Sequence, residues 1–207
     1  MMRAILPLSN HHSILSASHR SVLFRREPDW FPLRQGGLLP ADRALSSWVL
    51  EQGSLTARLR AEFGAGFGVK VLRQAWGRPY PNETRALQLS AGRRALIREV
   101  VLHCGGRPLV LARSVIPETA LKGTQSRLAR LGSRPLGELL FAYRSLRRLS
   151  LELTQVSGAS WQAELRNAID QGGKVWGRRS VYAVAHGEIL VAEFFLPAVL
   201  TNAADKV

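Results

Sequence analysis

Apolar residues after Pro40 recur three or four positions apart, which is the spacing of one face of a helix. They are Leu45, Trp48 and Val49, followed by Leu55, Leu59 and Phe63. Asp42 precedes the first run and Ser54 precedes the second, and each can accept a hydrogen bond from the first N–H groups of a helix. Gly53 lies between the runs, where it can end the first helix. The pattern predicts two consecutive short helices and indicates that ordered structure begins near Pro40.

From Gly68 the pattern changes to β-rich runs bounded by turn residues, which is typical of strands. The expected strands are 69–75, 95–103, 108–116, 178–185 and 188–196. The sequence Cys-Gly-Gly-Arg at 104–107 predicts a hairpin turn between the second and third strands, and His186-Gly187 predicts one between the last two. Pro117 and Pro197 end strands, because proline lacks the N–H that a strand ladder needs.

Helical segments are expected at 126–131, 136–143 and 161–169, grouped between the strand pairs. Antiparallel hairpins with grouped helices favour an α+β fold over an alternating βαβ fold. A chain of 207 residues with 46% hydrophobic residues suits one domain, which we place at 41–200, followed by a short tail at 201–207. No run approaches the ~18 consecutive apolar residues of a membrane-spanning helix, so no integral membrane segment is expected.

Residues 1–40 are expected to form a poorly ordered N-terminal extension. The first 26 residues contain four arginines, no acidic residue and no periodic apolar face. Three interpretations stay open for this stretch: an organelle transit segment, a start codon assigned too early, or a disordered tail. The single cysteine, Cys104, excludes an internal disulfide and suits a reducing compartment, so a cytoplasmic location is expected.

Basic residues outnumber acidic ones by 29 to 15, which gives a net charge of +14. Such an excess is typical of proteins that bind nucleic acid, an acidic membrane surface or a small polyanionic substrate. The arginines are dispersed in short doublets instead of gathered on one element, and the sequence has neither a zinc finger nor an RNP motif. We therefore expect no nucleic-acid partner, and a solvated surface accounts for most of the arginines.

Three charged residues, Arg98, Arg113 and Glu193, stand inside otherwise apolar strands and share a face with apolar neighbours. A buried charge needs a partner or a ligand, because desolvating it alone costs several kcal/mol. In one interpretation an arginine pairs with Glu193 or Glu99 to stabilise the fold. In the other, an arginine binds a substrate carboxylate through its planar fork, and Glu193 stays protonated and donates to a hydroxyl or ether oxygen. The pattern alone leaves both open.

Other motifs are weak. The five histidines lack the spacing of metal ligands, and GxSxG, Walker and dinucleotide-binding sequences are absent, so no metal and no nucleotide cofactor is expected. The glycine-rich stretch 64–68 precedes a strand, which favours a turn over a phosphate-binding loop. The sequence Trp-Gly-Arg-Arg at 176–179 fits an anion-binding nest or a solvated strand entry equally well.

Six short segments are informative as an ordered set: GSLTAR at 53–58, LIREV at 96–100, ARSVIP at 112–117, LGSRPLG at 131–137, WGRRS at 176–180 and VAEFFLP at 191–197. Together they resemble the bacterial chorismate lyase family over about residues 41–198. Each segment alone is unspecific, whereas the order of the six is specific. The resemblance implies an antiparallel sheet flanked by helices with an enclosed ligand site, in agreement with the α+β class.

The resemblance also implies the site residues. In the family, the aromatic product is held by an arginine and a glutamate at the positions of Arg98 and Glu193, and by backbone groups at those of Leu55 and Leu136. The family often has methionine at the position of Leu55, and a main-chain contact tolerates that change. Arg113 matches another recurrent family residue, which we expect to support the site or to bind a second carboxylate.

The implied reaction removes pyruvate from chorismate to give 4-hydroxybenzoate, which in this family enters ubiquinone synthesis. The implied enzyme is a carbon–oxygen lyase that needs no cofactor, and we expect a monomer. Arg98 would anchor the ring carboxylate and hold a reactive conformer. Glu193, held neutral, would act as a general acid on the ether oxygen.

Two departures from the family and two rival functions stay open. Residues 1–40 have no counterpart, and the stretch 147–173 is longer than usual, as an enlarged lid or a surface excursion would be. One rival is a non-catalytic ligand-sensing domain, because effector domains of some transcription regulators share this fold. Such proteins carry a helix-turn-helix, which 1–40 is too short and unpatterned to supply. The other rival is a basic protein that binds nucleic acid or a membrane surface.

Overall fold

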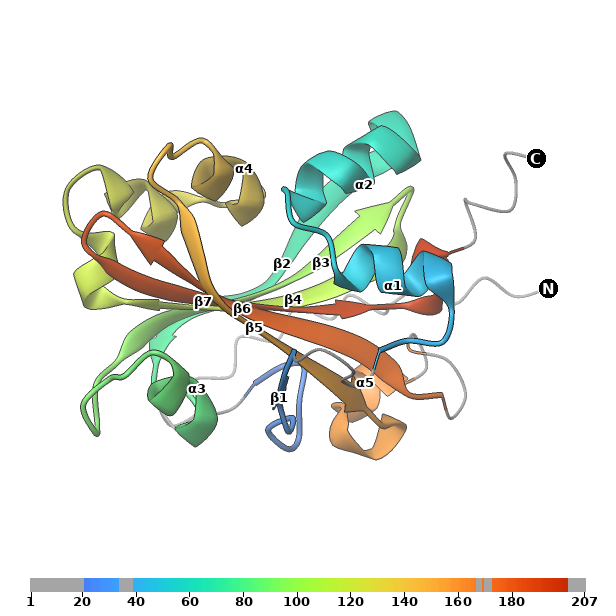
Figure 1. Ribbon diagram of the computed structural model, residues 1–207, viewed down its shortest axis with the longest axis horizontal. Helices are drawn as coiled ribbons and strands as arrows, with labels where there is room; N and C mark the ends of the chain where they lie inside the picture. The colour runs from blue at the N-terminus through green and yellow to red at the C-terminus, as the bar shows by residue number, and fades with distance from the viewer. Residues whose placement is uncertain (1–20, 34–38, 167–168, 170–172, 201–207) are drawn as a thin grey trace.

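The computed structural model describes residues 21–33, 39–166, 169 and 173–200 of the chain. These residues form one seven-stranded sheet with helices on both of its faces (Figure 1). Each strand pairs antiparallel with its neighbours. The predicted α+β class, an antiparallel sheet flanked by helices, is confirmed.

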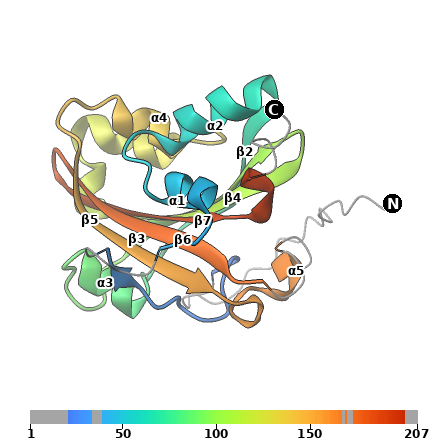
Figure 2. The same ribbon diagram turned by 45° about the vertical axis from the view of Figure 1, so that its right-hand side comes forward.

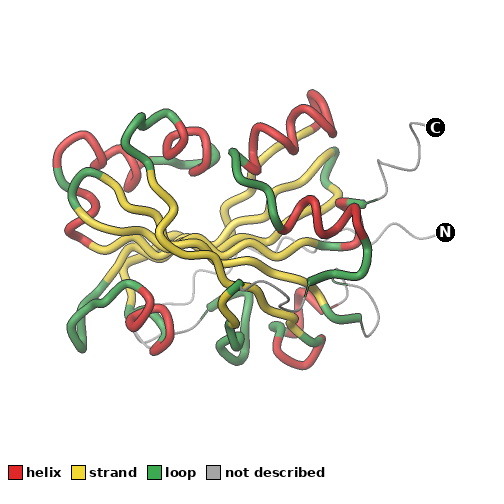
Figure 3. The backbone as a smooth tube through the Cα atoms, viewed as in Figure 1, coloured by secondary structure: helices red, strands yellow, loops and turns green. Residues whose placement is uncertain are grey.

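The strands form one continuous twisted layer, shown in yellow in Figure 3. In order across the sheet they are β1 (Phe31–Pro32), β5 (Arg147–Val156), β6 (Val175–Val184), β7 (Gly187–Phe195), β4 (Arg107–Pro117), β3 (Ala95–Cys104) and β2 (Phe67–Gly77). The five predicted strands correspond to β2, β3, β4, β6 and β7 within a few residues at each end. Tight turns join β3 to β4 and β6 to β7, where the glycines of 104–107 and Gly187 predict them.

Helices α1 (Arg43–Val49), α2 (Leu55–Phe63) and α4 (Leu136–Phe141) cover one face of the sheet (Figure 2). Helices α3 (Pro81–Ala86) and α5 (Ala163–Arg166) lie on the other. The predicted caps of the first two helices are confirmed. The Asp42 side chain accepts from two N–H groups at the start of α1, and Ser54 accepts from Ala57 N at the start of α2.

Two predicted helical segments differ from the structure. The segment expected at 126–131 belongs to a 3₁₀ helix, Gly123–Arg130. The helix expected at 161–169 is shorter, because Trp161 is extended and pairs with Phe24 in an isolated β-bridge. Helix α5 therefore begins only at Ala163, and the predicted positions 167–168 lie outside the described residues.

The first part of the long stretch 147–173 is strand β5, which pairs with β6 on one side and β1 on the other. The expectation of a lid or a surface excursion is therefore wrong for 147–156. Leucines alternate with polar residues from Leu149 to Leu153, which is the period of a strand. This short signal is masked by the arginines at 147–148, where the pairing with β6 also shifts register.

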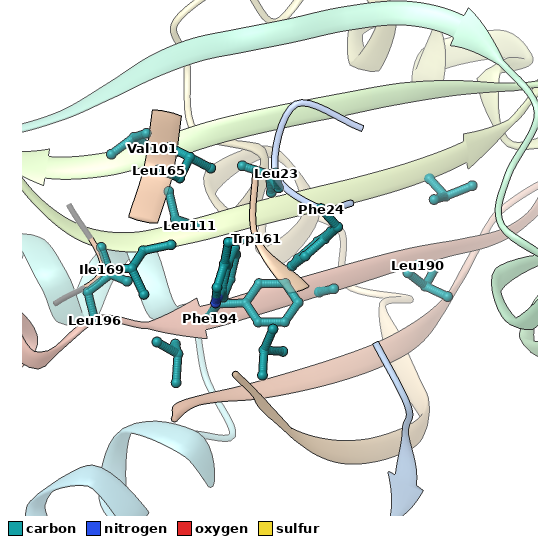
Figure 4. Close-up of a cluster of buried hydrophobic side chains, with 14 of the residues drawn as sticks. Leu23, Phe24, Val101, Leu111, Trp161, Leu165, Ile169, Leu190, Phe194 and Leu196 are labelled. Atoms are coloured by element: carbon teal, nitrogen blue, oxygen red, sulfur yellow. The ribbon is translucent and has the colours of Figure 1, made fainter. Parts of the chain in front are cut away.

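Structure begins well before Pro40. Leu23 and Phe24 are buried under the sheet, and β1 extends its edge. The Phe24 ring contacts Trp161 and Phe194 at centroid distances of 4.7 and 4.9 Å (Figure 4). Only one short apolar run marks this segment in the sequence, so it gave no periodic signal. The expectation of a poorly ordered 1–40 is wrong for residues 21–33, and the domain limits themselves stay a prediction.

The two sheet faces carry separate apolar cores. We call the face under α1, α2 and α4 the cavity face, and the face under α3, α5 and residues 21–33 the opposite face. The opposite face is packed around Phe194 with the side chains labelled in Figure 4. The cavity face is packed around Leu102 and Phe195 at one end and around Ile116 and Ile189 at the other. Charged residues lie between these two groups.

Candidate active site

A cavity of about 50 Å³ lies between the cavity face and helices α2 and α4. Its wall is mainly apolar and includes three charged side chains, Arg98, Arg178 and Glu193. Strands β3, β4, β7 and β6 form its floor, and the first residues of α2 and α4 form its roof. An apolar, enclosed space with a few charged groups is typical of a small-molecule site.

Small residues on β4 create the space between the two predicted ligand-binding charges. Ser114 pairs with Arg98 on β3, and Ala112 pairs with Glu193 on β7. Strand β4 lies between β3 and β7, so its side chains on this face fill the gap between the two charges. Serine and alanine leave room there for a flat ring, which a larger residue on β4 would exclude.

Arg98 is 2% exposed, and its hydrogen-bond acceptors among the described residues are all neutral. Its Nη1 donates to the carbonyl oxygen of Gly132 at 2.7 Å and to Gln74 Oε1 at 2.9 Å, and its Nη2 donates to the carbonyl oxygen of Arg134 at 3.0 Å. Burial lowers the pKa of Arg98.

Two donors of Arg98 remain available. Among the hydrogen bonds of the described residues, none uses Nε, and only one uses Nη2. These two N–H groups lie on the side of the guanidinium plane that can bind a carboxylate through two parallel bonds. Arg98 is therefore fixed through one edge and free to bind an anion through the other.

Glu193 is paired with an arginine of the segment 176–179, for which the sequence left an anion-binding nest and a solvated strand entry open. Arg178 is 1% exposed, and its Nε donates to Glu193 Oε2 at 2.6 Å. Burial alone would lower the pKa of Arg178, but Glu193 raises it overall. Glu193 accepts a charge-assisted hydrogen bond at this contact, and its predicted role as a proton donor stays a prediction. Among the described residues Glu193 therefore pairs with Arg178 and with neither Arg98 nor Arg113, the two arginines of the structural interpretation.

Helix α1 holds Arg178 in place. Its Nη1 lies 2.7 Å from the carbonyl oxygen of Glu51 and 3.3 Å from that of Val49, at the C-terminal end of α1. The last carbonyls of a helix carry partial negative charge, so they stabilise an arginine there. The sequence offers one signal for Arg178: it lies two positions after Trp176, on the same face of the strand. An arginine at the start of a strand can equally well be solvated, so this signal does not identify a buried charge.

Leu55 and Leu136 are the first residues of α2 and α4, and both line the cavity. The first N–H groups of a helix have no acceptor within it, so they can donate to a ligand. The two helix starts are close because Gly137 has no side chain. A Cβ there would lie 2.9 Å from Thr56 Oγ1. The structure therefore brings together four predicted site residues: Arg98, Glu193, Leu55 and Leu136.

Arg113 lies on the opposite face, away from the cavity. Its Nε and Nη2 donate to the two oxygens of Glu83 at 2.7 and 2.9 Å, and its Nη1 donates to Glu99 at 2.8 Å. These carboxylates raise the pKa of Arg113, although burial opposes them. The Ser21 hydroxyl and the Val22 N–H also donate to Glu99. The pairing of Arg113 with Glu99 agrees with the structural interpretation.

Within the described residues, no three His, Cys, Asp or Glu side chains lie close enough together to bind a metal ion. Nor do those residues include a helix that is both long and apolar enough to span a bilayer.

Comparison with known proteins identifies the family to which the chain is similar. The sequence model of the family described as chorismate lyase matches residues 33–205. The chain is 53% identical over 157 residues to a probable chorismate pyruvate-lyase from Methylococcus capsulatus, covering 76% of this chain and 97% of that protein. It is 44% identical over 166 residues to a protein of the same name from Azoarcus sp., covering 77% and 87%.

Solved structures with a similar fold belong to transcription regulators. The crystal structure of the PhnF C-terminal domain matches with a TM-score of 0.51 at 13% identity, covering 66% of this chain and 87% of that one. A GntR-family regulator from Bacillus cereus matches with a TM-score of 0.51 at 8% identity, covering 66% and 95%. At such low identity these structures support the fold alone.

Proposed function

The chain belongs to the chorismate lyase family, and we propose that it removes pyruvate from chorismate and releases 4-hydroxybenzoate. The observation that carries this proposal is the arrangement in the cavity. An arginine with two available donors stands on β3, a carboxylate stands on β7, and small residues lie between them. A para-substituted benzoate has a carboxylate and a hydroxyl at opposite ends of a flat ring, which matches this spacing of groups.

In this proposal Arg98 binds the ring carboxylate through Nε and Nη2. A charge-assisted pair of parallel bonds is stronger than a neutral hydrogen bond, and it fixes the direction of the ring. The backbone N–H groups of Leu55 and Leu136 donate to the ligand from above. Glu193, as a carboxylate, accepts a hydrogen bond from the ring hydroxyl at the other end. The ring is then held at both ends, which restricts the substrate to one reactive conformer.

The reaction balances without a co-reactant. The bond between ring carbon 3 and the ether oxygen breaks, and the hydrogen on ring carbon 4 moves to the methylene carbon of the departing enolpyruvyl group. Pyruvate leaves with the ether oxygen, and the ring becomes aromatic with its original hydroxyl at carbon 4. Glu193 therefore contacts the hydroxyl that stays on the ring. A general-acid role on the ether oxygen, as the sequence suggested, is replaced by this binding role.

Arg178 is placed to stabilise the departing group. The ether oxygen gains negative charge as its bond to the ring breaks, and a fixed cation in an apolar site stabilises such charge more than water does. Arg178 is fixed by Glu193 and by the end of α1, so it needs little rearrangement when the charge develops. We place Arg113 in a supporting role, since it ties β4 to β3 and α3 on the opposite face.

The direct test is incubation with chorismate, followed by detection of 4-hydroxybenzoate and pyruvate in equal amounts. The variant Glu193→Gln should bind 4-hydroxybenzoate about 10-fold more weakly, because an amide accepts a weaker hydrogen bond than a carboxylate. Glu188→Gln, on the same strand but outside the cavity wall, is the matched control. Equal affinity of wild type and Glu193→Gln for the product would exclude the contact.

The second candidate is the alternative named from the sequence, a ligand-sensing domain without catalysis. Tight binding of a small aromatic acid, with no product from chorismate, would favour that candidate. We further propose that the enzyme works as a cytoplasmic monomer without a cofactor and that its product enters ubiquinone synthesis. The family relationship supports these expectations.

We propose that the roof of the cavity moves when the substrate binds. An engineered protein cavity that binds benzene measures ~150 Å³, whereas this cavity measures about 50 Å³. Chorismate is larger than benzene, so we expect helices α2 and α4, or the side chains that they carry, to move away from the sheet. A partly exposed ion pair between Arg60 on α2 and Glu138 on α4 connects the two helices.

A further inference from the structure

We propose that Arg148, Arg178, Ser180 and Tyr182 form a second carboxylate subsite, which binds the carboxylate of the enolpyruvyl group. This inference rests on the proposed function, because it names the part of the site that takes the second carboxylate of chorismate. Arg178 and Tyr182 belong to the cavity wall. Arg148 is the cross-strand neighbour of Tyr182 on β5, and its guanidinium lies against the Tyr182 hydroxyl.

Two guanidinium groups converge on one acceptor. Arg178 Nη1 lies 2.7 Å and Arg148 Nη2 lies 3.1 Å from the carbonyl oxygen of Glu51. Like charges this close repel each other unless an anion lies between or beside them. Among the described residues, Glu193 is the one carboxylate that forms an ion pair with either arginine, and it contacts Arg178 alone; the Glu51 carboxylate acts on Arg178 from farther away and is paired with Arg58. One further negative charge would therefore stabilise this pair.

Several donors near this pair have no partner within the part of the chain that the structure describes. Arg148 Nη1 and Ser180 Oγ are buried there without a hydrogen bond. No hydrogen bond of the described residues uses Nη2 of Arg178. The Tyr182 hydroxyl accepts from Arg148, which leaves its own hydrogen to donate. Buried donors without partners are costly, so such a group of them indicates a ligand.

A carboxylate fits these groups. It has two oxygens that only accept hydrogen bonds, with about four lone-pair positions. Side chains alternate along a strand, so Arg178, Ser180 and Tyr182 point to the same face of β6. Arg148 approaches from the next strand, β5. The available donors are two cationic N–H groups and two hydroxyls, carried by the adjacent strands β5 and β6.

The position of these groups matches the shape of chorismate. Strand β6 adjoins β7, which carries Glu193, and lies on the side away from β3, which carries Arg98. A ring held between Arg98 and Glu193 has its carbon 3 next to the hydroxyl-bearing carbon 4. A substituent on carbon 3 can therefore extend over β7 toward β6. The product lacks that substituent, so the second subsite should affect substrate binding and leave product binding nearly unchanged.

The test compares Arg148→Gln with the matched control Arg147→Gln. Arg147 is the exposed neighbour on the same strand, so the control removes the same formal charge without touching the subsite. For Arg148→Gln we expect kcat/KM for chorismate to fall about 10- to 100-fold, the range for loss of hydrogen bonds to a charged group. The Kd of 4-hydroxybenzoate should change less than threefold. Arg147→Gln should leave both values within twofold.

Binding of an unreactive ligand tests the second carboxylate subsite without catalysis. The probe is 3-carboxymethoxy-4-hydroxybenzoate, an unreactive aromatic dicarboxylate, titrated beside 4-hydroxybenzoate. Wild type should bind the dicarboxylate at least 10-fold more tightly than Arg148→Gln does, and Tyr182→Phe, which retains the ring, should lose about fivefold. Equal losses for both ligands, or none for the dicarboxylate, would overturn the subsite. Binding of both probes with no chorismate turnover would instead overturn the proposed function.

Discussion

Buried arginines have different hydrogen-bond partners on the two faces of the sheet. On the cavity face Arg98 is held by neutral carbonyl and amide oxygens and keeps two donors available. On the opposite face Arg113 is held by two carboxylates, Glu83 and Glu99, which in turn accept from other buried groups. The two arginines come from adjacent strands, β3 and β4, in the same region of the sheet.

The difference separates structural from ligand-binding charges. Arg113 has its counter-charges inside the fold, so removing it leaves carboxylates buried without a partner. Arg98 has no carboxylate partner among the described residues, so its charge is available to an anionic ligand. The same chemical group is therefore neutralised by carboxylates of the fold on one face and is available to a ligand on the other.

The largest expected effect is on stability, at Arg113. Arg113→Met should lower the free energy of unfolding by about 3–5 kcal/mol, because Glu83 and Glu99 lose a buried counter-charge. Urea unfolding followed by tryptophan fluorescence measures the change. Adding Glu83→Gln and Glu99→Gln to the same chain should recover part of the loss. If the triple variant is as unstable as the single one, unpaired carboxylates are not the cause.

The next effect is on binding, at Arg98. Arg98→Met should weaken binding of 4-hydroxybenzoate about 100-fold, or ~2.7 kcal/mol, since a charged hydrogen-bonding partner of the carboxylate is lost. Its free energy of unfolding should change by less than that of Arg113→Met. Isothermal titration measures the affinity, and Arg134→Met, an exposed arginine beside the cavity, is the control. A binding loss as large in Arg134→Met would point to general electrostatic attraction.

A smaller effect is expected at the roof of the cavity. In Gly137→Ala the new Cβ would lie 2.9 Å from Thr56 Oγ1 and 3.4 Å from Ser54 Oγ, so either the Thr56 side chain rotates or α4 shifts away from α2. Such overpacking costs about 1–3 kcal/mol, and we expect faster dissociation of the product in stopped-flow measurements. Gly158→Ala, where no heavy atom lies within 4 Å of a Cβ, is the control. An unchanged dissociation rate in Gly137→Ala would show that this contact does not hold the roof closed.

The smallest effect is a pH dependence on the opposite face. Burial raises the pKa of Glu27 to about 7, and nearby Glu83 adds to this, whereas the Asn82 N–H opposes it. A raised carboxyl pKa means that stability is present below pH 4.5 and is lost as pH rises toward 7. Because Glu27 is half-exposed, the loss should be only about 1 kcal/mol.

Glu27→Gln tests this dependence, because the amide oxygen can still accept from the Asn82 N–H. Melting temperatures of wild type and variant should agree at pH 4.5 and differ at pH 8, where the variant should be the more stable. An equal difference at both pH values would show that titration of Glu27 is not responsible.

Periodicity predicted the regular elements well where the signal was long. Helices α1 and α2 and five of the strands follow from apolar spacing and from caps such as Asp42 and Ser54. Strand β5 and the segment 21–33 were missed for a shared reason: each has a short apolar signal and is stabilised by partners distant in the chain. Strand β5 needs β6, and Phe24 needs Trp161 and Phe194.

The site was predicted in part. Arg98 and Glu193 stood out as charges in apolar strands, and the family resemblance added Leu55 and Leu136. Arg148 was missed and Arg178 was left open as part of an anion-binding nest or a solvated strand entry, because arginines are frequent in this chain and their positions near strand ends fit a solvated surface. Both arginines donate to the carbonyl oxygen of Glu51, which is about 100 or more residues away in sequence. Only this contact between distant residues shows that the two guanidinium groups lie together.

The sequence by itself determined the α+β class, the family and the presence of charges inside apolar strands, because alternation and local caps depend on neighbouring residues. Only the tertiary structure decided which face each charge occupies and which partner neutralises it. Strand alternation places Arg98 and Glu99 on opposite faces, but it does not show which face is covered by Glu83 and residues 21–33. That covering, built from distant parts of the chain, makes one arginine structural and leaves the other available to a ligand.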